Sequence, residues 1–176
     1  MSNLEQIDRN FRLFRRLMKQ AGGKWVQIEY AGSGDSGSVE AGRLKLENDE
    51  WVDLRSIKQP FIERMTTVED WVPEKGWVQH QALRKITLSD IADEIIYDML
   101  SAYCGGWEIN EGSQGVGYID IEEGVRLEHT NMVWIPPEDS DDDFEDGTYE
   151  SGETDVFVYE PQSSAMERLT DQLQED

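Results

Sequence analysis

The chain is poor in cysteine and has no long apolar run. Its 176 residues include one cysteine, Cys104, so no disulfide can form within the chain. A chain without internal disulfides is typical of a protein that works in a reducing compartment. No stretch approaches the roughly 20 apolar residues that cross a bilayer, and the N-terminus lacks the apolar core of a signal peptide. We therefore expect a soluble, cytoplasmic protein with no membrane partner.

Basic residues are also scarce. The chain has 16 lysines and arginines against 38 acidic residues, and its formal net charge is −22. Residues 137–176 alone hold 15 acidic residues and one arginine, a net charge of −14. Such a surface repels nucleic acid and anionic membranes and attracts basic protein surfaces. We therefore expect a basic protein partner and no direct contact with nucleic acid.

The length and composition predict one globular domain, residues 1–176. Hydrophobic residues make up 38% of the chain and aromatic residues 10%, which is enough to build a core at this size. Helical periodicity predicts helices over 2–21 and 87–103, the first of them capped by Ser2 and Glu5. Alternation and turn residues predict the strands, which we place at 24–30, 38–46, 107–110, 116–121, 125–133 and 155–160.

These elements together indicate an α+β fold. We expect an antiparallel sheet of five to seven strands packed against two main helices, with a long acidic inter-strand loop. A capping pattern at Ser164 predicts a short C-terminal helix. Residues 48–86 give no clear pattern, and for this part we expect a short helix near 60–66 with irregular strands.

The densest acidic segment, residues 138–146, follows one predicted strand and precedes another. We therefore expect it to be a loop within the fold. Phe144 and Tyr149 interrupt the carboxylates, and apolar anchors in an acidic surface are typical of a docking epitope. A solvated loop that only maintains solubility is the alternative. The expected partner-binding residues are Glu138, Asp139, Asp141, Asp142, Asp143, Phe144, Glu145, Asp146 and Tyr149.

No pattern in the sequence indicates catalysis. The segment 34–37, Gly-Asp-Ser-Gly, matches the nucleophile motif of trypsin-like serine proteases over four residues only. In those enzymes the catalytic histidine comes before the serine, whereas His80 and His129 both follow Ser36. A glycine-rich hairpin tip explains the segment better. We expect no catalytic residue and no cofactor.

A metal-binding site is the second kind of functional site that we considered from the sequence. Carboxylates from Asp35, Glu40, Glu111 and Asp120 could converge on a hard cation. Acidic residues are so frequent in this chain that some convergence is expected by chance. We therefore expect no specific metal ligand.

Two glycine-rich segments carry a resemblance to a known kind of domain. Residues 30–40 (YAGSGDSGSVE), residues 105–112 (GGWEINEG) and residues 116–129 resemble a family of small, uncharacterised bacterial, phage and plasmid domains with no assigned activity. The resemblance covers 22–47 and 86–130, whereas 48–85 and 134–176 depart from it and look like additions.

The resemblance implies an α+β domain in which the two glycine-rich motifs lie near each other. If the motifs form a shared site, the resemblance points to six positions in this chain: Asp35, Ser36, Glu40, Trp107, Asn110 and Asp120.

Two functions from different classes remain open. The first is an acidic protein-binding or inhibitor protein that presents carboxylates to a basic partner, such as a nuclease or a CRISPR or restriction component. This would be a DNA mimic of a phage or mobile element, or an accessory protein that pairs constitutively with a basic neighbour. The alternative is a ligand- or metal-binding domain or an enzyme, with its site between residues 31–40 and 105–120.

Overall fold

The computed structural model describes residues 2–135 and 148–161. The elements run in the order α1 (Asn3–Ala21), β1 (Gly23–Leu46), β2 (Trp51–Asp53), η1 (Leu54–Ser56), β3 (Phe61–Val72), β4 (Gly76–Thr87), α2 (Leu88–Tyr103), β5 (Ile109–Asp120), β6 (Gly124–Ile135) and β7 (Thr148–Tyr159).

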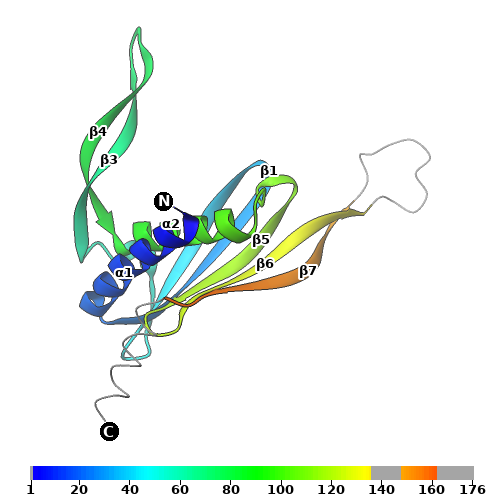
Figure 1. Ribbon diagram of the computed structural model, residues 1–176, viewed down its shortest axis with the longest axis horizontal. Coiled ribbons are helices and arrows are strands. Elements are labelled where there is room, and N and C mark those ends of the chain that lie inside the picture. Colours follow the sequence, from blue (N-terminus) through cyan, green and yellow to red (C-terminus); the bar gives the residue numbers. More distant parts are fainter. Residues whose placement is uncertain (1, 136–147, 162–176) are drawn as a thin grey trace.

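Five of the strands form one antiparallel sheet in the order β2-β1-β5-β6-β7. The long β1 folds back on itself as a hairpin, and both helices lie along one face of the sheet (Figure 1). Phe11 and Phe14 of α1 and Ile95 of α2 are fully buried in a single core with Ile28 and Leu127 of the sheet. The predicted α+β class, with an antiparallel sheet and two main helices, is confirmed.

Both helices begin and end close to where the sequence predicts. The side chain of Ser2 accepts a hydrogen bond from the amide of Glu5, and the Glu5 carboxylate accepts one from the amide of Ser2. Thr87 and Asp90 form the same reciprocal cap at the start of α2. These caps satisfy amides that have no partner within the helix. Gly22 ends α1 with φ of 67°, a left-handed conformation that glycine adopts easily.

The predicted helix near residues 60–66 is wrong, because Phe61–Val72 is a strand. β3 pairs with β4 from Phe61↔Thr87 to Val72↔Gly76 and forms a separate two-stranded sheet. This β3–β4 arm extends away from the rest of the molecule (Figure 1). Because most of the arm does not contact the core, its faces carry no clean alternation of apolar and polar residues. The signal that normally identifies a strand is therefore missing.

The strands of the second half are longer than predicted. β5 joins the predicted strands 107–110 and 116–121, and β7 begins at Thr148 instead of 155. Ile135 at the end of β6 pairs with Thr148 at the start of β7. The acidic run 138–146 therefore connects two paired strand ends, as predicted for an inter-strand segment. The run itself and the predicted helix after Ser164 lie outside the described residues.

Candidate functional site

The two glycine-rich motifs are direct neighbours in the sheet. β1 pairs with β5 through Gly32↔Ser113 and Gly34↔Asn110. At Gly112 the φ angle is 79°, and a Cβ atom would lie 1.9 Å from the carbonyl oxygen of Gly32. Only glycine allows the two backbones to approach this closely. The proximity that the resemblance implies is therefore present in the structure.

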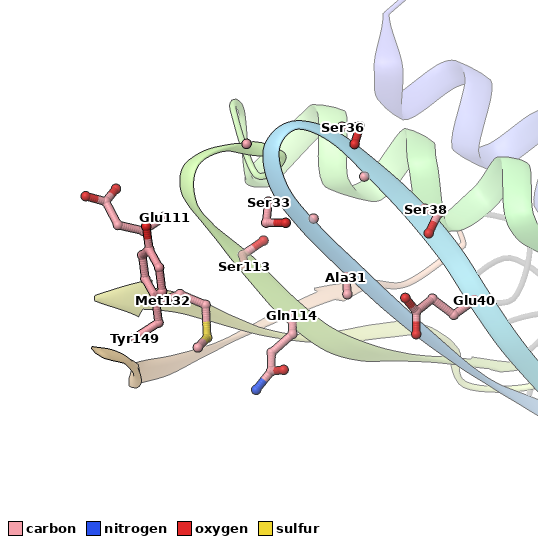
Figure 2. Close-up of a pocket in the computed structure, with 13 residues that line it drawn as sticks. Ala31, Ser33, Ser36, Ser38, Glu40, Glu111, Ser113, Gln114, Met132 and Tyr149 are labelled. Atoms are coloured by element: carbon pink, nitrogen blue, oxygen red, sulfur yellow. The ribbon is translucent and has the colours of Figure 1, made fainter. Parts of the chain in front are cut away.

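A hollow of about 740 Å³ lies at this end of the sheet. It is bounded by the tip of β1, the start of β5 and the adjoining ends of β6 and β7. Figure 2 shows Glu111, Met132 and Tyr149 on one side of the hollow and Ser38 and Glu40 on the other. The hollow is open to solvent, so a ligand bound there would stay partly exposed.

The structure brings together residues from both predicted sites. Ser36 and Glu40 come from the set that the resemblance implies, and Tyr149 comes from the set around the acidic run. All three line the hollow. Tyr149 is also the register partner of Trp134, and their rings lie 5.1 Å apart between centroids. The strand ends that carry the acidic run are therefore part of the same surface as the glycine-rich motifs.

Trp107 supports this surface from the core and does not line the hollow. Its side chain is 9% exposed and lies 5.7 Å from the ring of Tyr30 and 6.2 Å from that of Tyr97. Cβ atoms on Gly32 and Gly37 would lie 2.9 Å and 2.2 Å from the indole. These two glycines therefore make room for Trp107, which gives them a packing role.

Asp120 lies at the opposite end of β5 from the hollow. It lies six positions after Gln114, a distance of roughly 20 Å along a strand. Its carboxylate accepts hydrogen bonds from the amides of Glu122 (2.7 Å) and Glu123 (3.1 Å), and so caps the turn before β6. The side chains of Asp35 and Asn110, and all of residues 138–146, lie outside the described part of the structure.

Gln114 and Met132 are among the lining residues that the sequence analysis did not name as site residues. Gln114 lies between the second glycine-rich motif and the predicted strand 116–121, and it is exposed next to the buried Ser113. Met132 is on a predicted strand, but only the register of β6 against β7 brings it beside Tyr149. The sequence contains no signal for that register.

The electrostatic character of the hollow is acidic. Within the described residues, neither Glu40 nor Glu111 forms an ion pair, and no three side chains among His, Cys, Asp and Glu are placed to hold a metal ion. Hydroxyl groups of Ser33, Ser36 and Ser38 add hydrogen-bonding capacity. This set of groups fits the cationic side chains of lysine and arginine.

The groups that could activate a nucleophile are engaged elsewhere. His129 is buried, and its ring nitrogens contact the Tyr30 hydroxyl (2.9 Å) and the Asn131 side chain (3.2 Å). Burial raises the pKa of the Cys104 thiol to about 11, which opposes formation of the reactive thiolate. Both ring nitrogens of His129 are thus occupied within the sheet.

Comparisons with known proteins give one match. No helix in the described part of the chain is both long and apolar enough to span a membrane. No curated protein and no solved structure matched the chain. A family model did match, over residues 7–135. The matched range includes residues 48–85, which the sequence analysis interpreted as an addition to the family core. That interpretation stays a prediction. The acidic run lies beyond the match. The chain belongs to the family of unknown function DUF6878.

Proposed function

We propose that this protein binds a basic segment of a partner protein through its acidic surface. The observation that carries the proposal is the composition of one hollow, where Glu40 and Glu111 lie with Tyr149. Tyr149 lies on β7, the strand that follows the acidic run. The hollow and the acidic run 138–146 would then act as one docking surface, in which neither of the two carboxylates is already paired with a cation of the described chain.

The mixture of groups fits lysine and arginine side chains. The carboxylates attract the charged heads, while Met132 and Tyr149 offer apolar surface to the methylene stems. The open shape favours an extended segment over a small molecule, because small-ligand sites usually enclose most of their ligand. Net charge of −22 adds long-range attraction that speeds the encounter with a basic partner.

A partner that normally grips nucleic acid fits this chemistry best. Such proteins carry rows of cations spaced for phosphates, and a row of carboxylates can occupy the same cations. The finer proposal is therefore an inhibitor of DNA-mimic type, acting on a basic protein such as a nuclease or a CRISPR or restriction component. Under this proposal the chain and duplex DNA compete for the same surface of the partner. If the partner binds both at the same time, the proposal of a DNA mimic is rejected.

Variants of the hollow test the proposal directly. A peptide of alternating lysine and glycine serves as the probe, and calorimetry measures its affinity at fixed salt. We expect Glu40→Gln with Glu111→Gln to weaken binding roughly three- to tenfold, because each exposed ion pair contributes up to about 1 kcal/mol. Neutralising Asp141, Asp142, Asp143, Glu145 and Asp146 should weaken it further.

The matched control changes two exposed carboxylates on the β3–β4 arm, Glu63→Gln with Glu74→Gln. This control removes the same net charge at a distance from the hollow, so we expect nearly wild-type affinity. Equal loss in the hollow variant and the arm variant would mean that only total charge matters, and the proposed docking surface would be rejected.

A further inference from the structure

The β3–β4 arm (residues 61–87) exposes four large apolar side chains on one face. Met65 is 56% exposed, Trp71 63%, Trp77 69% and Leu83 61%. Met65 pairs with Leu83 and Trp71 with Trp77 in the register of the two strands, so all four project from the same face. An isolated two-stranded sheet is marginally stable in water. The four side chains form two exposed apolar pairs, six positions apart along each strand, and clustered apolar side chains on a surface often mark an interface.

The charge of the arm differs from that of the whole molecule. The rest of the chain carries the full net charge of −22, whereas residues 61–87 have none. The arm holds four acidic and four basic residues, namely Glu63, Glu69, Asp70, Glu74, Arg64, Lys75, Arg84 and Lys85. The β3–β4 arm therefore projects from a strongly acidic molecule but is itself neutral. The arms of two copies can meet without net electrostatic repulsion at the contact.

We propose that a second copy of this chain covers the apolar face of the arm and that two arms pack face to face around a two-fold axis. The spacing of the apolar residues is self-complementary. Val68 and His80 are register partners midway along the arm. Trp71 and Met65 lie three residues to either side of Val68, and Trp77 and Leu83 lie three residues to either side of His80.

A two-fold axis at the level of Val68 and His80 places each tryptophan over an aliphatic side chain of the other copy. Trp71 then packs on Met65 and Trp77 on Leu83, and the symmetry repeats both contacts, as an isologous interface requires. Methionine sulfur contacts aromatic rings favourably. Two tryptophans that already pack edge to face, 5.8 Å apart, form a preorganised anchor at each end.

The polar middle of this face is satisfied within each arm. Gln81 donates to the hydroxyl of Thr67 (2.7 Å), and Gln79 donates to the carboxylate of Glu69 (2.6 Å). Packing two arms together therefore leaves these side chains with hydrogen-bond partners. The charged Glu69 carboxylate has to keep its contact with solvent at the edge of the interface, because a buried carboxylate needs a cationic partner.

The area available suits a weak, reversible dimer. A tryptophan side chain can bury up to about 250 Å², so the exposed parts of four tryptophans supply about 600 Å² across two copies. Met65 and Leu83 of both copies bring the total toward the ~1,000 Å² at which specific interfaces begin. We therefore expect dimerisation that depends on protein concentration.

Sedimentation equilibrium of the full chain, from about 1 to about 200 µM, tests the inference. We expect a monomer–dimer equilibrium that tightens as salt rises from about 50 to about 300 mM, because salt screens the repulsion between two acidic bodies. The double change Trp71→Ser with Trp77→Ser should leave a monomer at all of these concentrations. Met65→Lys with Leu83→Lys should do the same.

The matched control is Val156→Lys with Val158→Lys, two exposed valines of β7. This control also loses two apolar side chains, and we expect it to dimerise as the wild type does. Circular dichroism confirms that each variant retains its fold. A wild-type chain that stays monomeric, or a dimer that survives both sets of arm variants, would overturn the inference.

The inference stands apart from the proposed function. The two double variants that remove the apolar face, Trp71→Ser with Trp77→Ser and Met65→Lys with Leu83→Lys, leave the hollow and the acidic run intact. They should therefore bind the lysine-rich peptide with wild-type affinity. Loss of dimerisation with retained peptide binding, and the reverse in the hollow variants, separate the two proposals.

Discussion

At the scale of single residues, the sheet contains a buried polar chain that the mechanism of partner binding does not use. The Tyr30 hydroxyl lies 2.9 Å from Nδ1 of His129 and 3.2 Å from the carbonyl oxygen of Glu128, and Nε2 of His129 lies 3.2 Å from Oδ1 of Asn131. Gly115 leaves the space for this hydroxyl, because a Cβ atom there would lie 2.2 Å from it. This row of hydrogen bonds links β1 to β6 across β5.

We predict that this hydrogen-bonded row makes the free energy of unfolding depend on pH. Burial lowers the pKa of His129 below its ordinary value of 6.5. The stability that neutral His129 contributes is therefore present above pH 6.5 and lost as the pH falls through the lowered pKa. Tyr30→Phe should cost about 1–3 kcal/mol at neutral pH, because a buried acceptor loses its partner.

Urea unfolding between about pH 5 and 8 measures both effects. The stability difference between the wild type and His129→Asn should shrink toward the acidic end of this range. A difference that stays constant across the range would show that His129 does not titrate in this way.

A second residue-scale prediction concerns the glycine-rich tip of β1. Gly37→Ala would place a Cβ atom 2.2 Å from the indole of Trp107, so the ring or the strand must move. We expect a loss of about 1–3 kcal/mol in the free energy of unfolding, which is typical of overpacking. Gly105→Ala is the control, since no atom lies within 4 Å of its added Cβ. If both substitutions have the same effect, the packing role of Gly37 is wrong.

At the scale of elements, the sequence predicts the helices better than the β3–β4 arm. A capping box and an apolar stripe identify α1, and an apolar stripe identifies α2, because these signals lie within the helices themselves. The arm has few contacts with the core, so its alternation carries no burial signal, and the predicted helix near 60–66 was wrong. The hollow is predicted only in part. Ser38, Glu40 and Met132 lie on predicted strands, whereas the lining residues in 31–37 and 111–114 and Tyr149 do not. Strand register brings Met132 and Tyr149 beside the glycine-rich motifs.

The junction of α2 with the arm gives a prediction at this scale. Arg64 of β3 forms an ion pair with Glu94 of α2, and Asp93 lies nearby. Burial raises the pKa of Asp93 to about 6, although the charge of Arg55 opposes the shift. The protonated form is favoured in the fold, so this contribution to stability is fully present below about pH 3.8 and lost as the pH rises through about 6.

Asp93→Asn should therefore gain stability relative to the wild type as the pH rises from about 4 to about 7. Thermal melts of both proteins across this range measure the difference in melting temperature. Asp90→Asn is a useful comparison, because Asp90 caps α2 through Thr87 and its loss should destabilise the helix. A difference for Asp93→Asn that falls as the pH rises would contradict the assignment.

At the scale of the whole molecule, the β3–β4 arm and the ends of β6 and β7 extend in different directions (Figure 1), and the surfaces that they carry differ in charge. The arm has no net charge and is apolar on one face. The hollow and the strand ends at Ile135 and Thr148 form the base of the acidic run. The two surfaces should respond to salt in opposite ways, since screening strengthens contact between like-charged copies and weakens contact between opposite charges.

The most direct test of the central claim is the salt dependence of peptide affinity. Calorimetry with the lysine-rich peptide, from about 50 to about 300 mM salt, gives the slope of the logarithm of affinity against that of salt concentration. We predict a steep fall for the wild type and the arm control, and a shallower fall for Glu40→Gln with Glu111→Gln. Affinity that does not change with salt, or equal slopes for the wild type and the hollow variant, would contradict the account.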